Sequence, residues 1–298
     1  MRVEVRNFRM QFAERVLIED LSFAVESGET FGFLGSNGSG KTTTLRALLG
    51  MVAPTGGRLL IDGEPHRPGT GRTVGYLPEE RGLYRKDPVL DVMVYFAVLK
   101  GIGRQRARSW SLEYLERVGL ADKANLHVGN LSGGQQQKVQ LGVAIMNDPG
   151  LLILDEPAKG LDPVNRQLLM DIVLERQRAG ATVILVTHNM DEVERLCDRA
   201  LLLRDGRAAA YGAIREIQSS HGPRRLIAEL RGELPTSPLF TVAHRDGETV
   251  RLHPVGDASD DDILAALVGA GARPVSFRSQ EVSMDEVFVR VHEERQEA

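Results

Sequence analysis

The chain has 298 residues, of which 42% are hydrophobic and 26% are charged, a balance typical of one or two globular domains with buried cores. Its net charge of -4 and sequence pI near 6.0 argue against a surface that binds nucleic acid or another polyanion. The single cysteine, Cys197, excludes an internal disulfide and fits a reducing compartment.

Neither a leader peptide nor a membrane span is expected. The residues from Met1 to Val5 alternate between apolar and polar instead of opening an apolar core. No apolar run reaches the roughly 18 residues that a membrane-spanning helix needs.

The first predicted elements are short strands. Arg2 to Phe8 alternates in the manner of a half-buried strand, and the apolar run from Leu21 to Val25 ends at the turn Ser27-Gly28-Glu29. Gly56 to Gly63 predicts a further short strand bounded by turns. Together these segments predict an antiparallel β layer.

Residues Gly35 to Thr42 have the sequence Gly-Ser-Asn-Gly-Ser-Gly-Lys-Thr, the pattern of a phosphate-binding loop. The apolar run Thr30 to Leu34 predicts a buried strand before the loop. Thr43 to Leu49 predicts a helix after it, and the positive end of that helix favours an anion. This context favours nucleotide binding over a chance Gly/Ser turn.

Each residue type in the loop suits a nucleoside triphosphate. The glycines let successive backbone N–H groups turn toward phosphate oxygens. Lys41 brings a positive charge for the β- and γ-phosphates, and the Thr42 hydroxyl suits Mg²⁺. The residues expected to bind ATP here are Gly35, Ser36, Asn37, Gly38, Ser39, Gly40, Lys41, Thr42 and Thr43.

From about residue 86 to residue 146 the apolar residues recur at helical spacing and predict a helical subdomain. Within it, the turn Leu131-Ser132-Gly133-Gly134-Gln135 opens a helix. Ser132 is a good N-cap, and the two glycines leave the first N–H groups open to an anion. The chain therefore contains two helix N-termini suited to phosphate.

The apolar run Leu151 to Leu154 predicts a buried strand that ends in Asp155 and Glu156. Open α/β sheets bind their ligands at the carboxyl ends of such strands. We expect Asp155 to hold Mg²⁺ and Glu156 to polarise a water for in-line attack on the γ-phosphate. An ordinary acidic turn after a strand is the alternative interpretation.

In their order along the chain, these motifs resemble those of the ATP-binding cassette (ABC) family over about residues 1–215. Leu131 to Gln135 looks like the family's signature motif, which closes over ATP held by the phosphate loop of another subunit. The resemblance implies an α/β fold of the P-loop nucleotide triphosphatase class, with a mixed sheet core, an antiparallel β layer and a helical subdomain. It also implies ATP and Mg²⁺ as cofactors and a second copy of the chain as a partner.

The resemblance assigns roles to three further residues. Phe12 looks like the aromatic residue that stacks on adenine, with a core side chain in the first hairpin as the competing interpretation. Gly160-Leu161-Asp162 matches the D-loop, which crosses to the partner subunit. His188 follows the apolar strand Val183 to Val186 and matches the switch histidine at the γ-phosphate, so Glu156 and His188 are the expected catalytic residues.

Two positions depart from the family's usual pattern. Glu79 follows the apolar segment Gly75 to Leu77, where the family carries glutamine. A carboxylate there can still bind Mg²⁺, so the expected metal ligands are Thr42, Asp155 and Glu79. Lys159 stands where a small polar residue is usual. The string Glu79 to Tyr84 resembles a bacterial export-type branch that includes sodium and drug efflux.

The rest of the chain predicts a separate unit. After a cassette over residues 1–218 and a linker over 219–225, residues 226–298 predict a small α+β domain. Leu239 to Leu252 predicts a hairpin turning at Asp246-Gly247, and Ser259 is the expected N-cap of a helix that starts with three aspartates. This unit resembles the C-terminal extension of some bacterial ABC export ATPases, which implies a docking, dimerising or regulatory role.

We favour the ATP-hydrolysing subunit of an ABC transporter, on the cytoplasmic face of the membrane, powering export through a separate permease and binding no nucleic acid. The alternative is a soluble ABC-type ATPase of translation or DNA repair, but such proteins usually carry two cassettes, a long coiled coil or zinc-binding cysteines. A small-molecule kinase would need the phosphate loop but not the signature turn or His188. A nucleotide sensor without activity would not need Glu156.

Overall fold

The structure, a computed structural model, describes residues 1–66, 74–80, 82–222, 225–232 and 234–293. By its internal contacts the chain divides into two compact units, a larger one from Met1 to Tyr211 and a smaller one from Gly212 to Ala298. Each unit buries a hydrophobic core of its own.

A six-stranded sheet lies at the centre of the larger unit, in the order β5-β6-β7-β3-β8-β9. The neighbours from β5 to β8 pair in parallel. β3, β6 and β7 are buried along their whole length, which is why their sequences are almost entirely apolar. The strands are β3 Thr30–Gly35, β5 Val74–Leu77, β6 Leu151–Asp155, β7 Thr182–Val186, β8 Arg199–Arg204 and β9 Arg207–Ala213.

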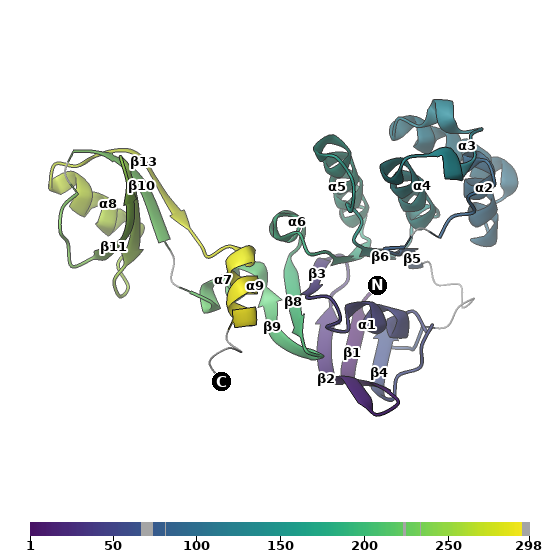
Figure 1. Ribbon diagram of the computed structural model, residues 1–298, viewed down its shortest axis with the longest axis horizontal. Coiled ribbons are helices and arrows are strands. Elements are labelled where there is room, and N and C mark those ends of the chain that lie inside the picture. Colours follow the sequence, from purple (N-terminus) through teal and green to yellow (C-terminus); the bar gives the residue numbers. More distant parts are fainter. Residues whose placement is uncertain (67–73, 81, 223–224, 233, 294–298) are drawn as a thin grey trace. The chain divides into compact units, whose positions relative to one another are not determined.

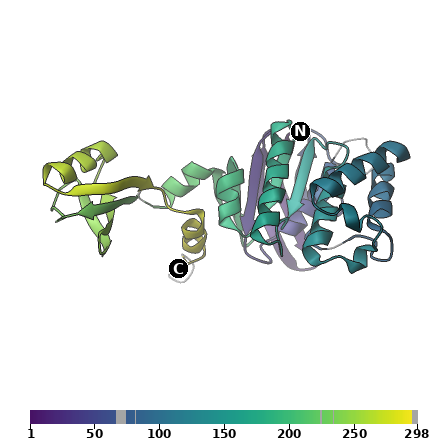
Figure 2. The ribbon, with the colours of Figure 1, turned by 90° about the horizontal axis from the view of Figure 1, so that it is seen from above.

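A three-stranded antiparallel sheet forms a second layer, with β1 (Val3–Phe12) between β2 (Arg15–Val25) and β4 (Gly56–Ile61). Helix α1 (Lys41–Leu48) shares one buried core with both sheets. Helices α5 (Pro163–Arg178) and α6 (Met190–Leu196) lie on the opposite face of the six-stranded sheet (Figures 1 and 2).

A helical arm is inserted between β5 and β6. It contains α2 (Val89–Leu99), α3 (Arg104–Arg117) and α4 (Gly133–Ile145), which lie together in Figure 1. Short 3-10 turns, η1 (Ala121–Lys123) and η2 (Val128–Asn130), connect α3 to α4. Because the arm starts just after β5, its first residues lie at the carboxyl edge of the parallel sheet.

The smaller unit contains a four-stranded antiparallel sheet in the order β11-β12-β10-β13. Helix α8 (Asp260–Gly269) packs on this sheet, with Ile263 and Leu267 fully buried in the core. Helices α7 (Ile214–Ser220) and α9 (Met284–Glu293) contact each other. The strands are β10 Arg225–Arg231, β11 Phe240–Asp246, β12 Thr249–Pro254 and β13 Arg273–Gln280.

The predicted α/β fold class is confirmed, including the antiparallel layer, the helical subdomain and the small α+β unit. The boundary between the units differs from the prediction. It falls after Tyr211 and not at residue 218, because α7 contacts α9 and therefore belongs to the smaller unit. Part of the predicted linker, Pro223 and Arg224, and Arg81 of the export-branch string lie outside the described residues.

Candidate active site

Four strands of the parallel sheet end at one edge, and each delivers a segment that the sequence singled out. β3 leads into the phosphate loop, β5 into Glu79, β6 into Asp155 and Glu156, and β7 into His188. Since β5, β6, β7 and β3 are consecutive neighbours in parallel register, their carboxyl ends converge. This convergence is the usual ligand-binding position of an open α/β sheet.

The phosphate loop depends on two glycines. Gly40 is the N-cap of α1 and has a φ of 112°, a conformation that residues with a side chain rarely adopt. A Cβ on Gly35 would lie only 2.2 Å from the carbonyl oxygen of Leu203 on β8. The loop can therefore pass this close to the sheet only with glycine at position 35.

Lys41 and Ser39 lie inside this loop. The Nζ of Lys41 donates hydrogen bonds to the carbonyl oxygens of Gly35 at 2.7 Å and Ser36 at 3.0 Å. Burial lowers the pKa of Lys41, while the charges of Glu156, Asp155 and Glu79 act in the opposite direction. The Oγ of Ser39 is buried without a hydrogen-bond partner among the described atoms, as expected of a polar atom that awaits a ligand.

Asp155 is almost completely buried at the end of β6. Burial, together with the neighbouring charges of Glu79 and Glu156, raises its pKa to about 6, and the attraction of Lys41 and Arg46 acts in the opposite direction. The structure thus brings three carboxylates and the loop lysine into one electrostatic neighbourhood.

Glu156 and His188 are joined by a hydrogen bond. The Nδ1 of His188 lies 2.9 Å from the Oε1 of Glu156, and the Glu156 side chain is only 14% exposed whereas that of His188 is 74% exposed. Glu156 has a φ of 50°, an unusual backbone conformation for a residue with a side chain, and such outliers cluster at functional sites. Its backbone N–H also donates to the carbonyl oxygen of Val186 at 2.8 Å, which extends the pairing of β6 with β7.

The signature turn has the predicted local structure. The Oγ of Ser132 accepts a hydrogen bond from the backbone N–H of Gln135, and the Gln135 side chain accepts one from the Ser132 N–H, which is a capping box. A Cβ on Gly134 would meet the Leu161 side chain at 3.2 Å. The turn therefore packs against the segment after β6, and Gly134 provides the room.

The structure bears differently on the roles expected for Phe12 and Asp162. Phe12 ends β1 and is 52% exposed, so the alternative interpretation as a core side chain is wrong. Asp162 is the N-cap of α5 and accepts a hydrogen bond from the Asn165 N–H at 2.9 Å. This capping accounts for Asp162 within a single chain, and its role toward a partner stays a prediction.

Sequence reasoning missed several buried polar residues that hold the site together. The Gln140 amide on α4 donates to the carbonyl oxygens of Pro78 at 3.2 Å and Glu80 at 3.0 Å, and that of Gln137 donates to Pro157 at 3.0 Å. The sequence did contain a signal for these residues, because glutamines stand among the apolar residues on the buried side of α4.

Glu192, beside His188, is another buried polar residue that holds the site together. Its buried carboxylate accepts hydrogen bonds from the Thr187 Oγ1 at 3.0 Å and the Asn189 Nδ2 at 3.3 Å. Burial raises the pKa of Glu192. By holding the residues on both sides of His188, Glu192 fixes the segment that carries the histidine.

The expected metal ligands Thr42, Asp155 and Glu79 provide hard oxygen donors, which suit Mg²⁺. Among the residues that the structure describes, no group of three or more His, Cys, Asp or Glu side chains is arranged to hold a metal by itself. Mg²⁺ is usually held by one or two carboxylates together with substrate phosphates. These residues therefore fit a Mg²⁺ ion that binds together with a nucleotide.

Glu79 and Lys159, the two departures noted in the sequence, are in direct contact. The Nζ of Lys159 donates to the Oε1 of Glu79 at 2.6 Å, although 80 positions separate the two residues. The hydrogen bond to Glu79 and its negative charge raise the pKa of Lys159.

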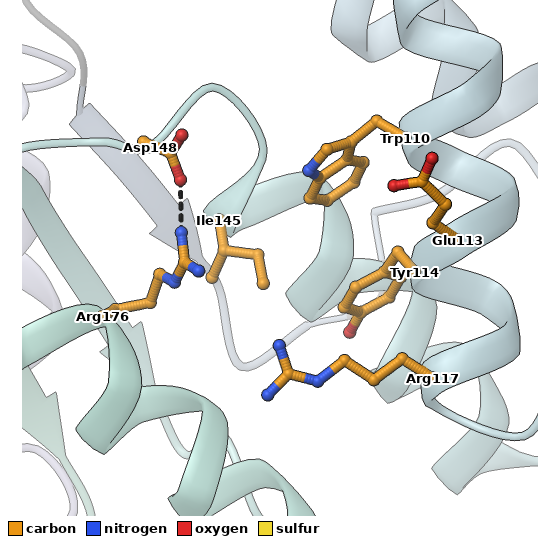
Figure 3. Close-up of a pocket in the computed structure, with 7 residues that line it drawn as sticks. All are labelled: Trp110, Glu113, Tyr114, Arg117, Ile145, Asp148 and Arg176. Carbon is orange, nitrogen blue, oxygen red and sulfur yellow. Dashed lines mark hydrogen bonds and ion pairs between the residues drawn. The ribbon is translucent and has the colours of Figure 1, made fainter. Parts of the chain in front are cut away.

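A cavity of about 320 Å³ lies apart from these residues, between α3, the end of α4 and α5 (Figure 3). Trp110 stacks on Tyr114 with 5.3 Å between ring centroids. The two arginines in the cavity wall are paired, Arg176 with Asp148 and Arg117 with Glu175. None of the predicted site residues lines this cavity, and its ion pairs join the helical arm to the core of the unit.

Comparison with known proteins agrees with this geometry. Residues 18–159 match the family model described as ABC transporter. An uncharacterized ABC transporter ATP-binding protein of Methanocaldococcus jannaschii is 42% identical over 72% of this chain and 79% of its own length. The Nod factor export ATP-binding protein I of Burkholderia lata is 34% identical over 97% of this chain and 96% of its own length.

Two solved structures resemble the larger part of the chain. The structure of an ATP binding subunit of an ABC transporter is 29% identical, has a TM-score of 0.69 and covers 74% of this chain and 93% of its own. The structure of cbiO1 from Clostridium perfringens, part of the ABC transporter complex cbiONQ, is 26% identical, has a TM-score of 0.63 and covers 73% of this chain and 90% of its own.

Proposed function

This chain belongs to the ABC transporter family as an ATP-binding subunit, and on that premise we propose that it powers export through a separate membrane permease. As a member of the family it is an ATPase. The observation that carries the assignment of ATP hydrolysis to this site is the convergence, at one sheet edge, of the phosphate loop with the hydrogen-bonded pair Glu156 and His188.

We assign the chemistry to the chain's own residues as follows. Lys41 and the loop N–H groups bind the phosphates of ATP. Glu156 accepts a hydrogen bond from the attacking water and draws its proton, while His188 holds the Glu156 carboxylate and contacts the γ-phosphate. Thr42, Asp155 and Glu79 hold Mg²⁺, which neutralises charge on the triphosphate when it is bound.

Two copies of the chain form the working unit in this proposal. One chain carries one phosphate loop and one signature turn, each at a helix N-terminus. Head-to-tail pairing lets the Ser132 turn of each copy close over ATP on the loop of the other. Asp162 lies at the start of α5, beside the segment against which that turn packs.

Export and a permease partner are supported by two observations. The export protein of Burkholderia lata aligns with nearly the whole chain, including the smaller unit. On the helical arm, the rings of Tyr84, Tyr95 and Phe96 contact one another, and both tyrosines are about half exposed. An exposed apolar patch of this kind is typical of a protein interface.

None of the helices in the described part of the chain combines the length and apolar character that crossing a bilayer requires. We therefore assign the pore to a second protein and place this chain at the cytoplasmic face of the membrane. Purification of the tagged chain from detergent-solubilised membranes tests the assignment. Recovery of the chain without any membrane-spanning protein, under conditions that preserve such complexes, would argue against it.

The catalytic assignment is tested by Glu156→Gln. The amide keeps the shape of the side chain but cannot draw a proton from water, so we expect a loss of ATP turnover of about 10² or more, with ATP binding retained. With ATP, this variant should form dimers in light scattering. Turnover at the parent rate would exclude Glu156 as the catalytic carboxylate, and a protein that stays monomeric with ATP would contradict pairing of the isolated subunit.

A further inference from the structure

Glu79 and Lys159 connect two neighbouring loops of the candidate active site. Glu79 lies in the segment after β5, and Lys159 lies in the segment after β6, just before the D-loop residues Gly160 to Asp162. The two strands are parallel neighbours in register, with Leu77 opposite Leu154. The ion pair at 2.6 Å therefore joins the side chains of two loops whose backbones start side by side.

The backbone around both partners is fixed by α4. Gln140 binds the carbonyl oxygens of the residues before and after Glu79, and Gln137 binds that of Pro157, two residues before Lys159. These amides leave the Glu79 and Lys159 side chains as the parts that can change partners. The pair is also partly exposed, at 43% for Glu79 and 58% for Lys159, so it can open without unfolding either loop.

The charges around Glu79 and Lys159 indicate a role for their ion pair. The negative charges of Glu79, Asp155 and Glu156 all act on Lys41, whereas glutamine at position 79 would leave two such charges. Lys159 is a second cation beside these carboxylates, and it contacts the additional one directly. A lysine at position 159 therefore offsets the charge that the glutamate adds.

We propose that Lys159 is a positioning residue that competes with Mg²⁺ for the carboxylate of Glu79. This inference rests on the proposed function of the site. While Lys159 holds Glu79, its ammonium occupies the Oε1 atom and competes with a metal for the carboxylate; when a nucleotide brings Mg²⁺, the carboxylate exchanges the ammonium for the metal. Each cycle of nucleotide binding then makes and breaks a contact between the loop after β5 and the loop that leads to the D-loop.

Metal affinity measured at equilibrium tests this competition. The probe is Mn²⁺, followed by electron paramagnetic resonance on the full chain with a saturating non-hydrolysable ATP analogue. Lys159→Gln should tighten Mn²⁺ binding by roughly two- to fivefold, the range expected for release of a partly exposed ion pair. Lys159→Arg keeps a cation that can reach Glu79 and should stay close to the parent.

The decisive comparison is made in a second background. Glu79→Gln should weaken Mn²⁺ binding, and adding Lys159→Gln to it should change nothing further, because the lysine has lost the carboxylate for which it competes. An equal change in both backgrounds, or no change in either, would overturn the inference and leave Lys159 as an ordinary surface charge.

Failure of the proposed function is distinguishable in the same experiment. A parent chain that binds the analogue and Mn²⁺ in no measurable amount would contradict the nucleotide site itself. Unchanged melting temperatures of the variants without nucleotide show that the fold is intact, so that a change in Mn²⁺ affinity reports on the site. The exposed positions of both side chains make that control straightforward to meet.

Discussion

Asp155 lies at the end of β6 with its side chain out of solvent, beside the carboxylates of Glu79 and Glu156. Burial and these charges raise its pKa to about 6, well above the ordinary value of 3.8. Ionised Asp155 therefore costs folding free energy in the absence of a bound cation. Asp155 is therefore placed to bind a metal, and its charge lowers the stability of the fold when no cation is bound.

Asp155→Asn should stabilise the chain without nucleotide at pH 8 by about 1 to 3 kcal/mol, because the variant removes a buried charge. The folded-state pKa of Asp155 is raised, so the penalty is fully present above pH 6. It fades as the pH falls from 6 toward 3.8, where both the folded and the unfolded chain are protonated. Chemical denaturation at several pH values should show the advantage of the variant shrinking over this window, while Mn²⁺ binding is lost at every pH.

Glu175→Gln provides a control of opposite sign. Hydrogen bonds from Arg117 and then Arg176 lower the pKa of Glu175 to about 2, so its ion pairs add stability above pH 4.5 that disappears as the pH falls toward 2. The variant should therefore be less stable than the parent at pH 8. If Asp155→Asn and Glu175→Gln shift stability in the same direction, the electrostatic account of Asp155 is wrong.

Helix α4 connects the signature turn to two other loops of the site. Its first turn is capped by Ser132, and the amides of Gln137 and Gln140 hold the segments after β6 and β5. A displacement of α4 would thus be passed to the loops that carry Glu79 and Glu156. Helix α4 therefore holds these two loops in place in addition to carrying the signature motif.

Gln140→Met tests whether α4 holds these loops in place, since methionine has a similar volume and cannot donate a hydrogen bond. Two backbone carbonyl oxygens would lose their partner, which should cost about 1 to 3 kcal/mol of stability. Because the loop that carries Glu79 is then free to shift, turnover of ATP should fall more than nucleotide binding. The exposed Gln105→Met on α3 should stay within about 0.5 kcal/mol of the parent. Equal stability of the two variants in denaturant titration would show that the Gln140 hydrogen bonds contribute nothing to the free energy of unfolding.

Local patterns explain why much of this site could be predicted from the sequence. The strand, loop and helix around Gly35 to Thr42 are adjacent in the chain, and Ser132 forms its cap within four residues. The contact between Glu79 and Lys159 could not be predicted, because it depends on β5 lying beside β6 after the insertion of the whole helical arm. The exposure of Phe12 likewise depends on the tertiary structure, since a hairpin aromatic is compatible with burial or exposure.

At the scale of the whole chain, the two units bury separate cores. The core shared by α1 and the two sheets of the larger unit draws on residues from Val3 to Leu203, and the core of the smaller sheet draws on residues from Leu226 to Ala272. The predicted boundary at residue 218 was late because α7 continues directly from β9, with no break in the sequence that marks a new unit. All the proposed catalytic and nucleotide-binding residues lie in the larger unit.

A chain that ends at Ala213, the last residue of β9, should therefore fold and bind the ATP analogue with the affinity of the full chain. Its melting temperature should lie within about 4 °C of that of the full chain, equivalent to about 1 kcal/mol for a unit of this size. A chain that ends at Asp198 is the matched control. It loses β8, which pairs with β3 and packs against Gly35 of the phosphate loop, so it should not fold. If the longer truncation also fails to bind nucleotide, the smaller unit is part of the folded cassette and the division into two independent units is wrong.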